Sequence, residues 1–413
     1  MTLACTVPAP DDQSAGGVVA VVAPDGPEPD LGLARAGWSA IAVRLPLHTL
    51  PLSQTDECPA EGAFSLQITH ETMRRTLNAL RTRQVSAVVA GSPAGVDLAD
   101  QLATCLGLPA NCPATAVLRR DRQAQGAALT HAGLPSVRGM HTESLAAAVS
   151  WARFVQFPEY VLAPADTSTP GARICRTPDE ISLAWPHLRR TAYRHSGDQH
   201  LVLCERLPGA QYVVHTLTGP GPSGGAEHTV TDIWASTRTA AHQPDRMDLV
   251  PPTGLLPRAL TVYLRPVLDQ LGVTTGAFRS RIVYTPDRGP ILLSTRAVPG
   301  IPAGHRLPGS GRAFSYDYAR PRHQPQLHVA RVSLIAPADG LIDGCLLRML
   351  TALATVTRVD DALRPGAPVT RTTDRATSPG ELVLAADDVR ALDADYRAIR
   401  RVEARGLYQG SAR

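Results

Sequence analysis

The sequence contains no lysine, and all 41 of its basic residues are arginine. Lysine is the residue that forms Schiff bases with carbonyl substrates, acts as an amine general base and binds phosphate as a compact point charge. All three roles are therefore excluded for this chain. Arginine binds carboxylate or phosphate through two parallel hydrogen bonds, so the recognition of anions remains possible.

Several other features are scarce. The chain has two asparagines, Asn78 and Asn111, and its seven cysteines form no CxxC pair. This cysteine usage predicts reduced thiols and a cytoplasmic protein. No apolar run approaches 18 residues, and no basic segment precedes the apolar stretch at 17–24. We therefore expect neither a membrane span nor a signal peptide.

The charge is weak and evenly spread. A net charge of +4 over 413 residues, with acidic and basic residues interspersed, gives neither a nucleic-acid-binding stripe nor a polybasic membrane anchor. We expect no nucleic-acid partner and no membrane partner. The length exceeds what one core supports and predicts two or three domains, for which a hydrophobic content of 44% is ample.

The first hundred residues alternate short apolar runs with helical patterns. The runs at 17–24, 39–45 and 85–92 are typical of buried strands, and the segments 71–84 and 96–108 have helical spacing. Such alternation predicts a parallel α/β layer with a ligand crevice at the carboxyl ends of the strands.

Strand patterns dominate the middle of the chain. A helix is predicted over 118–136, ending at Gly133, and another over 257–271. The segment 302–326 reads as a long surface loop, and 387–407 as a charged helix. The predicted strands lie at 160–164, 200–207, 211–217 and 228–236 and in a hairpin within 276–294.

In order and spacing these segments resemble the ATP-grasp superfamily, in particular its carboxylate–amine ligases, which join amino acids or peptides. The stretch "FPEYVLAPADTSTPGARICRTPDE" (157–180) is similar to the strand and loop that cover the ATP phosphates in that family. "LVLCERLPGAQYVVHTL" (201–217) resembles its hinge strand and the strand that follows, and "GAFRSRIVYTPDRGPILLS" (276–294) its metal-binding hairpin. "TRTTDRATSPGELVL" (370–384) looks like its small C-terminal domain.

The resemblance implies an α/β, ATP-grasp-like fold in four parts. An N-terminal parallel α/β (pre-ATP-grasp) domain would cover 1–115 and the small lobe 116–195. The central lobe would cover 196–325 and a small C-terminal domain 326–413. In the family this fold holds ATP and magnesium.

The chain departs from the family at both phosphate-binding lysines. The two positions correspond to Arg122 and Ala163. Arginine at the first position still contacts phosphate oxygens, whereas alanine at the second does not. The loop that follows Ala163, which corresponds to the loop covering the phosphates, contains Pro170. Proline lacks the backbone N–H that such loops present to phosphate.

The family's two metal-binding glutamates are also missing, because their places in the hairpin correspond to Arg281 and Ser294. Magnesium needs hard oxygen ligands, usually including carboxylates. Asp287, in the turn, is the only acidic residue between Gly276 and Tyr316, so a shift of register does not restore the site. We therefore predict no metal site, and ATP and magnesium only if other acids replace the lost glutamates.

Arginines accumulate where the metal ligands are lost. In the family, the magnesium ions and the two glutamates together leave a net positive charge at this place. Arg279, Arg281 and Arg296 would supply a comparable positive charge without metal. We infer that the former nucleotide cleft binds a carboxylate or a phosphate by arginine forks. Residues 279 and 281 share one strand face, so both side chains either enter the cleft or are solvated outside the sheet.

Other residues keep part of the family's pattern. Glu205 corresponds to the hinge residue that serves nucleotide binding, and Asp232 and Trp234 also match, whereas a nearby aspartate has become His215. We group His215, Asp232 and Trp234 with the arginines as candidate ligand-binding residues. The catalytic residues stay unknown, because no carboxylate orienter for the histidine is visible in the sequence, and Cys204 is interpreted as a small buried hydrophobe.

Three functions remain open. The first is a degenerate ATP-grasp protein, a pseudoenzyme of secondary (natural-product) metabolism, which binds an anionic amino-acid-like or peptide-like molecule either as a binding or partner protein or as a metal-free catalyst. The second is an active ATP-dependent carboxylate–amine ligase with unusual ligands, for example Asp232 or Asp287 at the metal. The third is a structural partner of an active paralogue, with a collapsed cleft.

Overall fold

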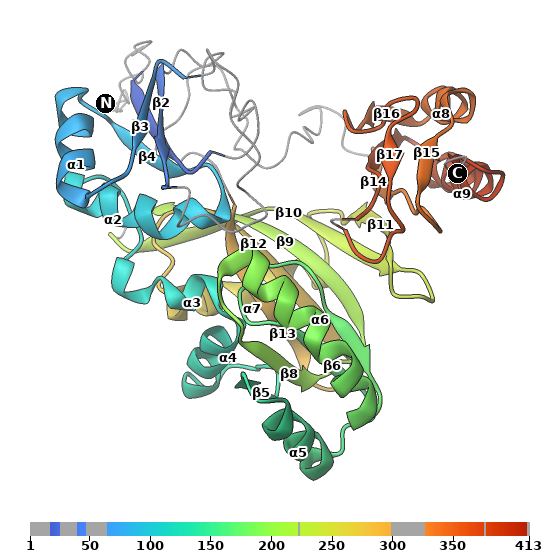
Figure 1. The fold of residues 1–413 in the computed structure, drawn as a ribbon, viewed down its shortest axis with the longest axis horizontal. Helices are drawn as coiled ribbons and strands as arrows, with labels where there is room; N and C mark the ends of the chain where they lie inside the picture. The colour runs from blue at the N-terminus through green and yellow to red at the C-terminus, as the bar shows by residue number, and fades with distance from the viewer. Residues whose placement is uncertain are drawn as a thin grey trace, which may run out of the picture.

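A computed structural model describes residues 17–24, 39–46, 64–221, 224–298, 327–375 and 377–410. The loop predicted for 302–326 lies outside these residues. Figure 1 shows the N-terminal sheet and the C-terminal part at opposite sides of the molecule, above a long central sheet and a small lobe. No helix in the described part of the chain is long and apolar enough to cross a membrane.

The N-terminal part is a parallel sheet, as predicted, and its strand order is β3-β2-β1-β4, with β3 a strand that was not predicted. Its strands form because their apolar, largely β-branched residues bury against the helices; Leu80 and Leu102 of these helices are fully buried against the sheet. The elements are β1 (Val18–Val22), β2 (Ser39–Arg44), β3 (Leu66–Thr69), α1 (Met73–Thr82), β4 (Ala87–Ala90) and α2 (Val96–Leu106).

The single helix predicted over 118–136 is wrong, because the chain forms two helices, α3 (Val117–Arg120) and α4 (Arg122–His131). Asp121 between them has extended backbone angles, and its side chain caps α4 by accepting a hydrogen bond from the Ala124 N–H at 2.7 Å. A capping aspartate thus starts a new helix inside a continuous helical pattern.

The small lobe is an antiparallel sheet with strand order β5-β8-β6-β7. It includes β8, which extends the lobe past the boundary predicted at 195. Two helices without a sequence prediction cover it. The longer begins at the cap Thr177, which accepts a hydrogen bond from the Glu180 N–H at 3.2 Å, while the Glu180 carboxylate accepts one from the Arg176 N–H at 2.7 Å. The elements are β5 (Gly139–Thr142), α5 (Leu145–Val155), β6 (Tyr160–Pro164), β7 (Arg173–Cys175), α6 (Pro178–Ser196) and β8 (Leu201–Glu205).

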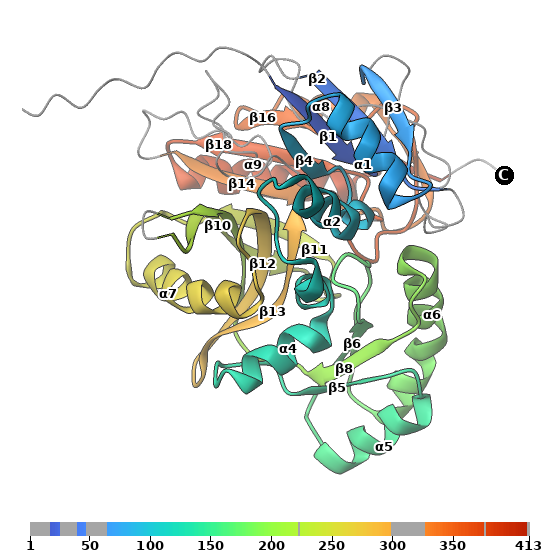
Figure 2. The ribbon, with the colours of Figure 1, turned by 90° about the vertical axis from the view of Figure 1, so that its left-hand side faces the viewer.

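The central sheet has eight strands in the order β13-β12-β9-β10-β11-β14-β18-β16. It runs without interruption from the predicted central lobe into the predicted C-terminal domain. One face is covered by α7 (Leu255–Gln270), which lies beside β12 and β13 in Figure 2. The strands are β9 (Ala210–Pro220), β10 (Ala226–Arg238), β11 (Pro244–Leu249), β12 (Gly276–Thr285), β13 (Gly289–Val298), β14 (His328–Ser333), β16 (Val356–Val359) and β18 (Glu381–Ala386).

The C-terminal part packs α9 (Val389–Ala404) against β14 and β18 of the central sheet. Leu392, Ile399 and Val402 recur at helical spacing along α9 and are buried in this contact. The remaining elements are α8 (Gly344–Thr351) and a small sheet of β15 (Gly340–Ile342), β17 (Pro368–Val369) and β19 (Tyr408–Gln409).

Candidate functional site

A large cleft lies between the small lobe, the central sheet and the loop at 371–375 of the C-terminal part. Its volume is about 1920 Å³, which exceeds the several hundred Å³ of an ordinary small-ligand pocket. The small lobe contributes α4, β6, β8 and the loop at 167–172, and the central sheet contributes β9, β12 and β13. The cleft therefore collects side chains from all four stretches on which the family resemblance rests, at 157–180, 201–217, 276–294 and 370–384.

Arginines from the central sheet line this cleft. Arg279 and Arg281 alternate on β12 and both enter the cleft, and Arg296 on β13 lies opposite Arg279 in the strand pairing. Of the two orientations left open by strand alternation, the structure places this pair inside. Four further arginines are close enough to act electrostatically on the pair, namely Arg122, Arg238, Arg331 and Arg375.

Arg279 and Arg281 carry positive charge without a counter-charge. Burial, followed by repulsion from the neighbouring arginines, lowers the pKa of each to about 9. Among the described residues neither side chain has a hydrogen-bond or ion-pair partner, and the Nε atom of Arg279 is buried. This arrangement is unfavourable for the protein alone and becomes favourable when an anion enters.

The positions of the two family lysines behave differently from each other. Arg122 extends to the small lobe, where its Nη1 donates to the carbonyl oxygens of Pro164 and of Asp166, the latter at 2.5 Å. Burial lowers the pKa of its guanidinium, and the charge of Asp166 partly opposes that shift. Ala163 is buried in β6 and presents only a methyl group to the cleft.

The loop that corresponds to the phosphate-covering loop is already occupied by a carboxylate. Asp166 Oδ1 accepts hydrogen bonds from the backbone N–H groups of Ser168 at 2.7 Å and Thr169 at 3.2 Å, and from the Ser168 hydroxyl. Pro170 follows and has no N–H to offer. The donors that would hold a phosphate thus hold an internal negative charge, which sequence reasoning did not anticipate.

Glu205, at the hinge position, is enclosed by two arginines. Arg138 donates to its Oε2 from Nη2 at 2.6 Å and from Nε at 3.0 Å, and Arg288 donates to Oε1 at 2.7 Å. Burial on its own raises the pKa of this carboxyl, but these hydrogen bonds outweigh it and hold the pKa below its usual value. Both carboxylate oxygens are therefore engaged within the protein.

His215, Asp232 and Trp234 form a connected group beside the arginine pair. His215 Nδ1 and Asp232 Oδ1 are 2.5 Å apart, and the same oxygen accepts a hydrogen bond from Trp234 Nε1 at 2.6 Å. Asp232 is thus the carboxylate orienter that was not visible in the sequence. His215 lies directly across from Arg279 in the pairing of β9 with β12, although it does not line the cleft itself.

The two expected metal positions, Arg281 and Ser294, face each other across β12 and β13. Within the described ranges, no group of three or more histidine, cysteine, aspartate or glutamate side chains is placed to hold a metal ion. Of the two acids considered as replacements, Asp232 is bound to His215, and Asp287 is exposed in the hairpin turn.

Cys204 lines the cleft between Arg122 and Glu205 but is poorly suited to nucleophilic chemistry. Burial raises the pKa of its thiol to about 12, and Glu205 adds to this shift while Arg122 opposes it. The thiolate is therefore disfavoured at neutral pH.

No protein-family model and no curated protein matches the sequence. Solved structures do match. An L-amino acid ligase from Bacillus licheniformis has 15% identity and a TM-score of 0.65, over 94% of this chain and 98% of that one. The ADP complex of purK, an N5-carboxyaminoimidazole ribonucleotide synthetase, has 13% identity and a TM-score of 0.63, over 94% and 97%. An N5-carboxyaminoimidazole synthase from Aspergillus clavatus, with ADP and 5-aminoimidazole ribonucleotide, has 12% identity and a TM-score of 0.63, over 95% and 100%.

Proposed function

We propose that this chain, which has the fold of the ATP-grasp enzymes, binds a small anionic molecule in its cleft through arginine side chains and without magnesium–ATP. The observation that carries the proposal is the pair Arg279 and Arg281, which enter the cleft, are half-buried and have no counter-charge among the described residues. A carboxylate or phosphate supplies that counter-charge with directional, charge-assisted hydrogen bonds.

Contacts at the former nucleotide positions support the same conclusion. The Asp166 carboxylate occupies the loop donors and would repel a phosphate, and Ala163 provides no charge. Both oxygens of Glu205 are held by arginines, so a ribose or base would have to displace an ion pair. Each of these positions opposes the family's way of binding ATP.

The proposed ligand is amino-acid-like or peptide-like, and the proposed setting is natural-product biosynthesis in the cytoplasm. The proposed partner is a second biosynthetic protein that supplies the ligand or takes it over. The open cleft opposes a purely structural role, which would favour apolar filling.

An active ATP-dependent carboxylate–amine ligase is the second candidate. It is favoured by the match over nearly the whole chain to a structure described as an L-amino acid ligase and to a synthetase described in complex with ADP. This candidate requires carboxylates that could hold magnesium in the cleft, and the described acids there are Glu205, Asp245 and Asp374. The first two are already engaged in ion pairs.

Calorimetric titration separates the two candidates. The purified chain is titrated with pyrophosphate, with ATP and with a non-hydrolysable ATP analogue, each with and without magnesium. We expect pyrophosphate to bind without magnesium and to lose at least about a hundredfold in affinity in Arg281→Glu. Arg265→Glu is the matched control, because this exposed arginine on α7 lies outside the cleft. Tight binding of ATP that depends on magnesium would overturn the proposal in favour of the ligase.

A further inference from the structure

The arginines whose charges act on the β12 pair fall into two groups, one around Arg279 and one around Arg281. The charges that act on Arg279, apart from Arg281 and the shared Arg296, are those of Arg375 and Arg331 in the C-terminal part. We call these three residues the C-terminal subsite.

The second group includes one residue of the small lobe, Arg122. The charges that act on Arg281, apart from the shared Arg296, are those of Arg238 and Arg122. Arg122 is fixed to the small lobe by its hydrogen bonds to backbone carbonyls, so this group includes a cation from the opposite wall of the cleft. We call Arg281, Arg238 and Arg122 the lobe subsite.

Strand geometry separates the centres of the two subsites. Residues two apart on a strand point to the same face and are about 6.8 Å apart along it, because each residue of an antiparallel strand advances about 3.4 Å. Mutual repulsion favours keeping the two guanidinium groups apart, since two like charges 4 Å from each other repel by about 4 kcal/mol at an effective dielectric constant of 20. The two subsites therefore favour separate anionic groups.

Charge balance leads to the same result. Acidic side chains partly neutralise the outer arginines of each subsite. Glu381 pairs with Arg331 and Arg375, and Asp374 acts on Arg238. Arg279 and Arg281 each remain without a counter-charge among the described residues. A ligand with one negative charge would compensate only one of them.

We propose that the ligand carries two anionic groups, one held by Arg279 in the C-terminal subsite and one held by Arg281 in the lobe subsite. This inference rests on the proposed function, because it takes the cleft to be an anion site. It narrows the ligand to an elongated dianion, such as a dicarboxylate or a phosphorylated carboxylate.

The test compares adipate, which has a carboxylate at each end, with hexanoate, which has the same chain length and one carboxylate. Both are titrated into the full-length protein without magnesium, next to inorganic phosphate as a single group with more than one charge and pyrophosphate as the general probe. We expect adipate to bind at least about tenfold more tightly than hexanoate and than phosphate.

Two variants assign the subsites. In Arg279→Gln and in Arg281→Gln, adipate is expected to lose its advantage and to bind about as weakly as hexanoate does to the unchanged protein, whereas hexanoate should change by less than about threefold. Arg265→Gln on the outer helix serves as the matched control and should leave both affinities unchanged. The ligand comparison itself needs no variant, so misfolding of a variant does not remove the test.

The two proposals fail in different ways. If pyrophosphate binds but adipate has no advantage over hexanoate, or phosphate binds as tightly as adipate, the two-group inference is overturned and the anion site stands. If pyrophosphate, adipate and hexanoate all fail to bind, the proposed function is overturned together with the inference.

Discussion

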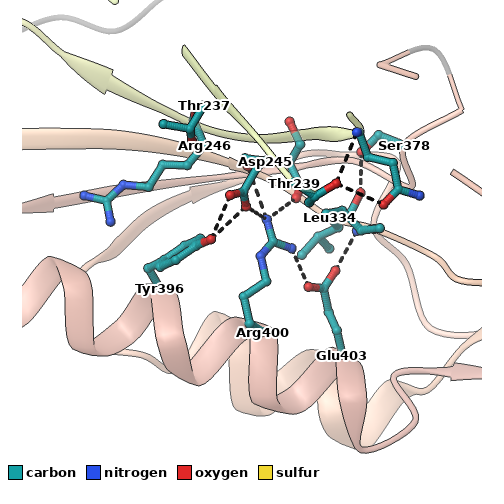
Figure 3. A network of polar contacts seen from close by, with 12 residues as sticks. Thr237, Thr239, Asp245, Arg246, Leu334, Ser378, Tyr396, Arg400 and Glu403 are labelled. Carbon is teal, nitrogen blue, oxygen red and sulfur yellow. Dashed lines mark hydrogen bonds and ion pairs between the residues drawn. The ribbon is translucent and has the colours of Figure 1, made fainter. Parts of the chain in front are cut away.

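Half-buried arginines on the central sheet and on α9, the helix that packs against this sheet, differ in their counter-charges. Where α9 meets β11, Arg400 Nη2 donates to Asp245 Oδ1 at 2.7 Å, its Nη1 pairs with Glu403, and the Tyr396 hydroxyl donates to Asp245 at 2.8 Å (Figure 3). In the cleft, Arg281 has no such partner among the described residues.

The pKa values of these arginines move in opposite directions. Burial on its own lowers the pKa of Arg400, but Glu403, Tyr396 and Asp245 outweigh burial and raise it. Burial also lowers the pKa of Arg281, and the surrounding arginines lower it further, to about 9. The charge of Arg400 is thus neutralised by acidic side chains of the same chain, whereas the charge of Arg281 is neutralised only when an anion binds.

The largest effect, on the free energy of unfolding, is expected from breaking the ion pairs of Arg400 with Asp245 and Glu403. Arg400→Met leaves Asp245 and Glu403 without their cation, and should lower the free energy of unfolding by about 3–5 kcal/mol. Urea unfolding followed by circular dichroism measures the loss. The control is Arg397→Met, an exposed position on the same helix, which should change the free energy of unfolding by less than about 0.5 kcal/mol. Equal effects of the two substitutions would show that the Arg400 group is not a stabilising centre.

The pH dependence of anion binding distinguishes the two kinds of arginine. The free cleft arginines Arg279 and Arg281 have a pKa of about 9, so above this pH they lose the charge that attracts the anion. Adipate affinity should therefore fall as pH rises through about 9, by about tenfold per pH unit for each arginine that must regain its proton. Calorimetry between neutral and alkaline pH measures this slope. If adipate affinity stayed constant across this pH range, Arg279 and Arg281 would not be the residues that bind the anion.

Asp166 tests whether an internal carboxylate closes the loop to phosphate. In Asp166→Ala the N–H groups of Ser168 and Thr169 lose their acceptor and become available to a ligand. We expect pyrophosphate affinity to rise about tenfold, because backbone N–H groups in such loops bind anions. The measurement is the same titration, with Asp360→Ala as a control, because this loop aspartate also accepts a hydrogen bond from the N–H two residues on and lies outside the cleft. An unchanged pyrophosphate affinity would mean that the ligand does not reach this loop.

The smallest effect expected is a gain in stability. At neutral pH both cleft arginines are charged in the folded and in the unfolded chain, and their lowered pKa means that folding disfavours the charged form. This cost is present below pH 9 and fades above it, because the unfolded chain then binds more protons. Arg281→Met should therefore raise the free energy of unfolding of the ligand-free protein by about 1 kcal/mol, measured by urea unfolding at pH 7. A loss of stability would indicate a structural partner for this side chain.

The fold was largely predictable because its signals are local. Apolar runs and turn residues indicated the parallel sheet and the hairpin at 276–294, and the structure confirms both. The helix α6 was missed although the cap Thr177 marks its start. The break at Asp121 was missed because a capping aspartate also fits inside a helical pattern.

The site was predictable only in part. Strand alternation places Arg279 and Arg281 on one face but does not say which face meets the cleft. The contact between His215 and Asp232 depends on the register of two strands across an irregularity, and no residue pattern specifies that register. The turn in which the Asp166 carboxylate accepts hydrogen bonds from the N–H groups of the following loop is a local conformation. The sequence is compatible with this turn and with other conformations.

Thermal unfolding of the double variant Arg279→Met/Arg281→Met, with and without pyrophosphate and in the absence of magnesium, shows whether these two arginines form the anion site. We predict that the ligand-free variant unfolds at a higher temperature than the unchanged protein, and that pyrophosphate raises the unfolding temperature only of the unchanged protein. Two results would contradict the claim that Arg279 and Arg281 bind an anion: a ligand-free variant that unfolds at a lower temperature than the unchanged protein, or a variant that pyrophosphate stabilises as much as the unchanged protein.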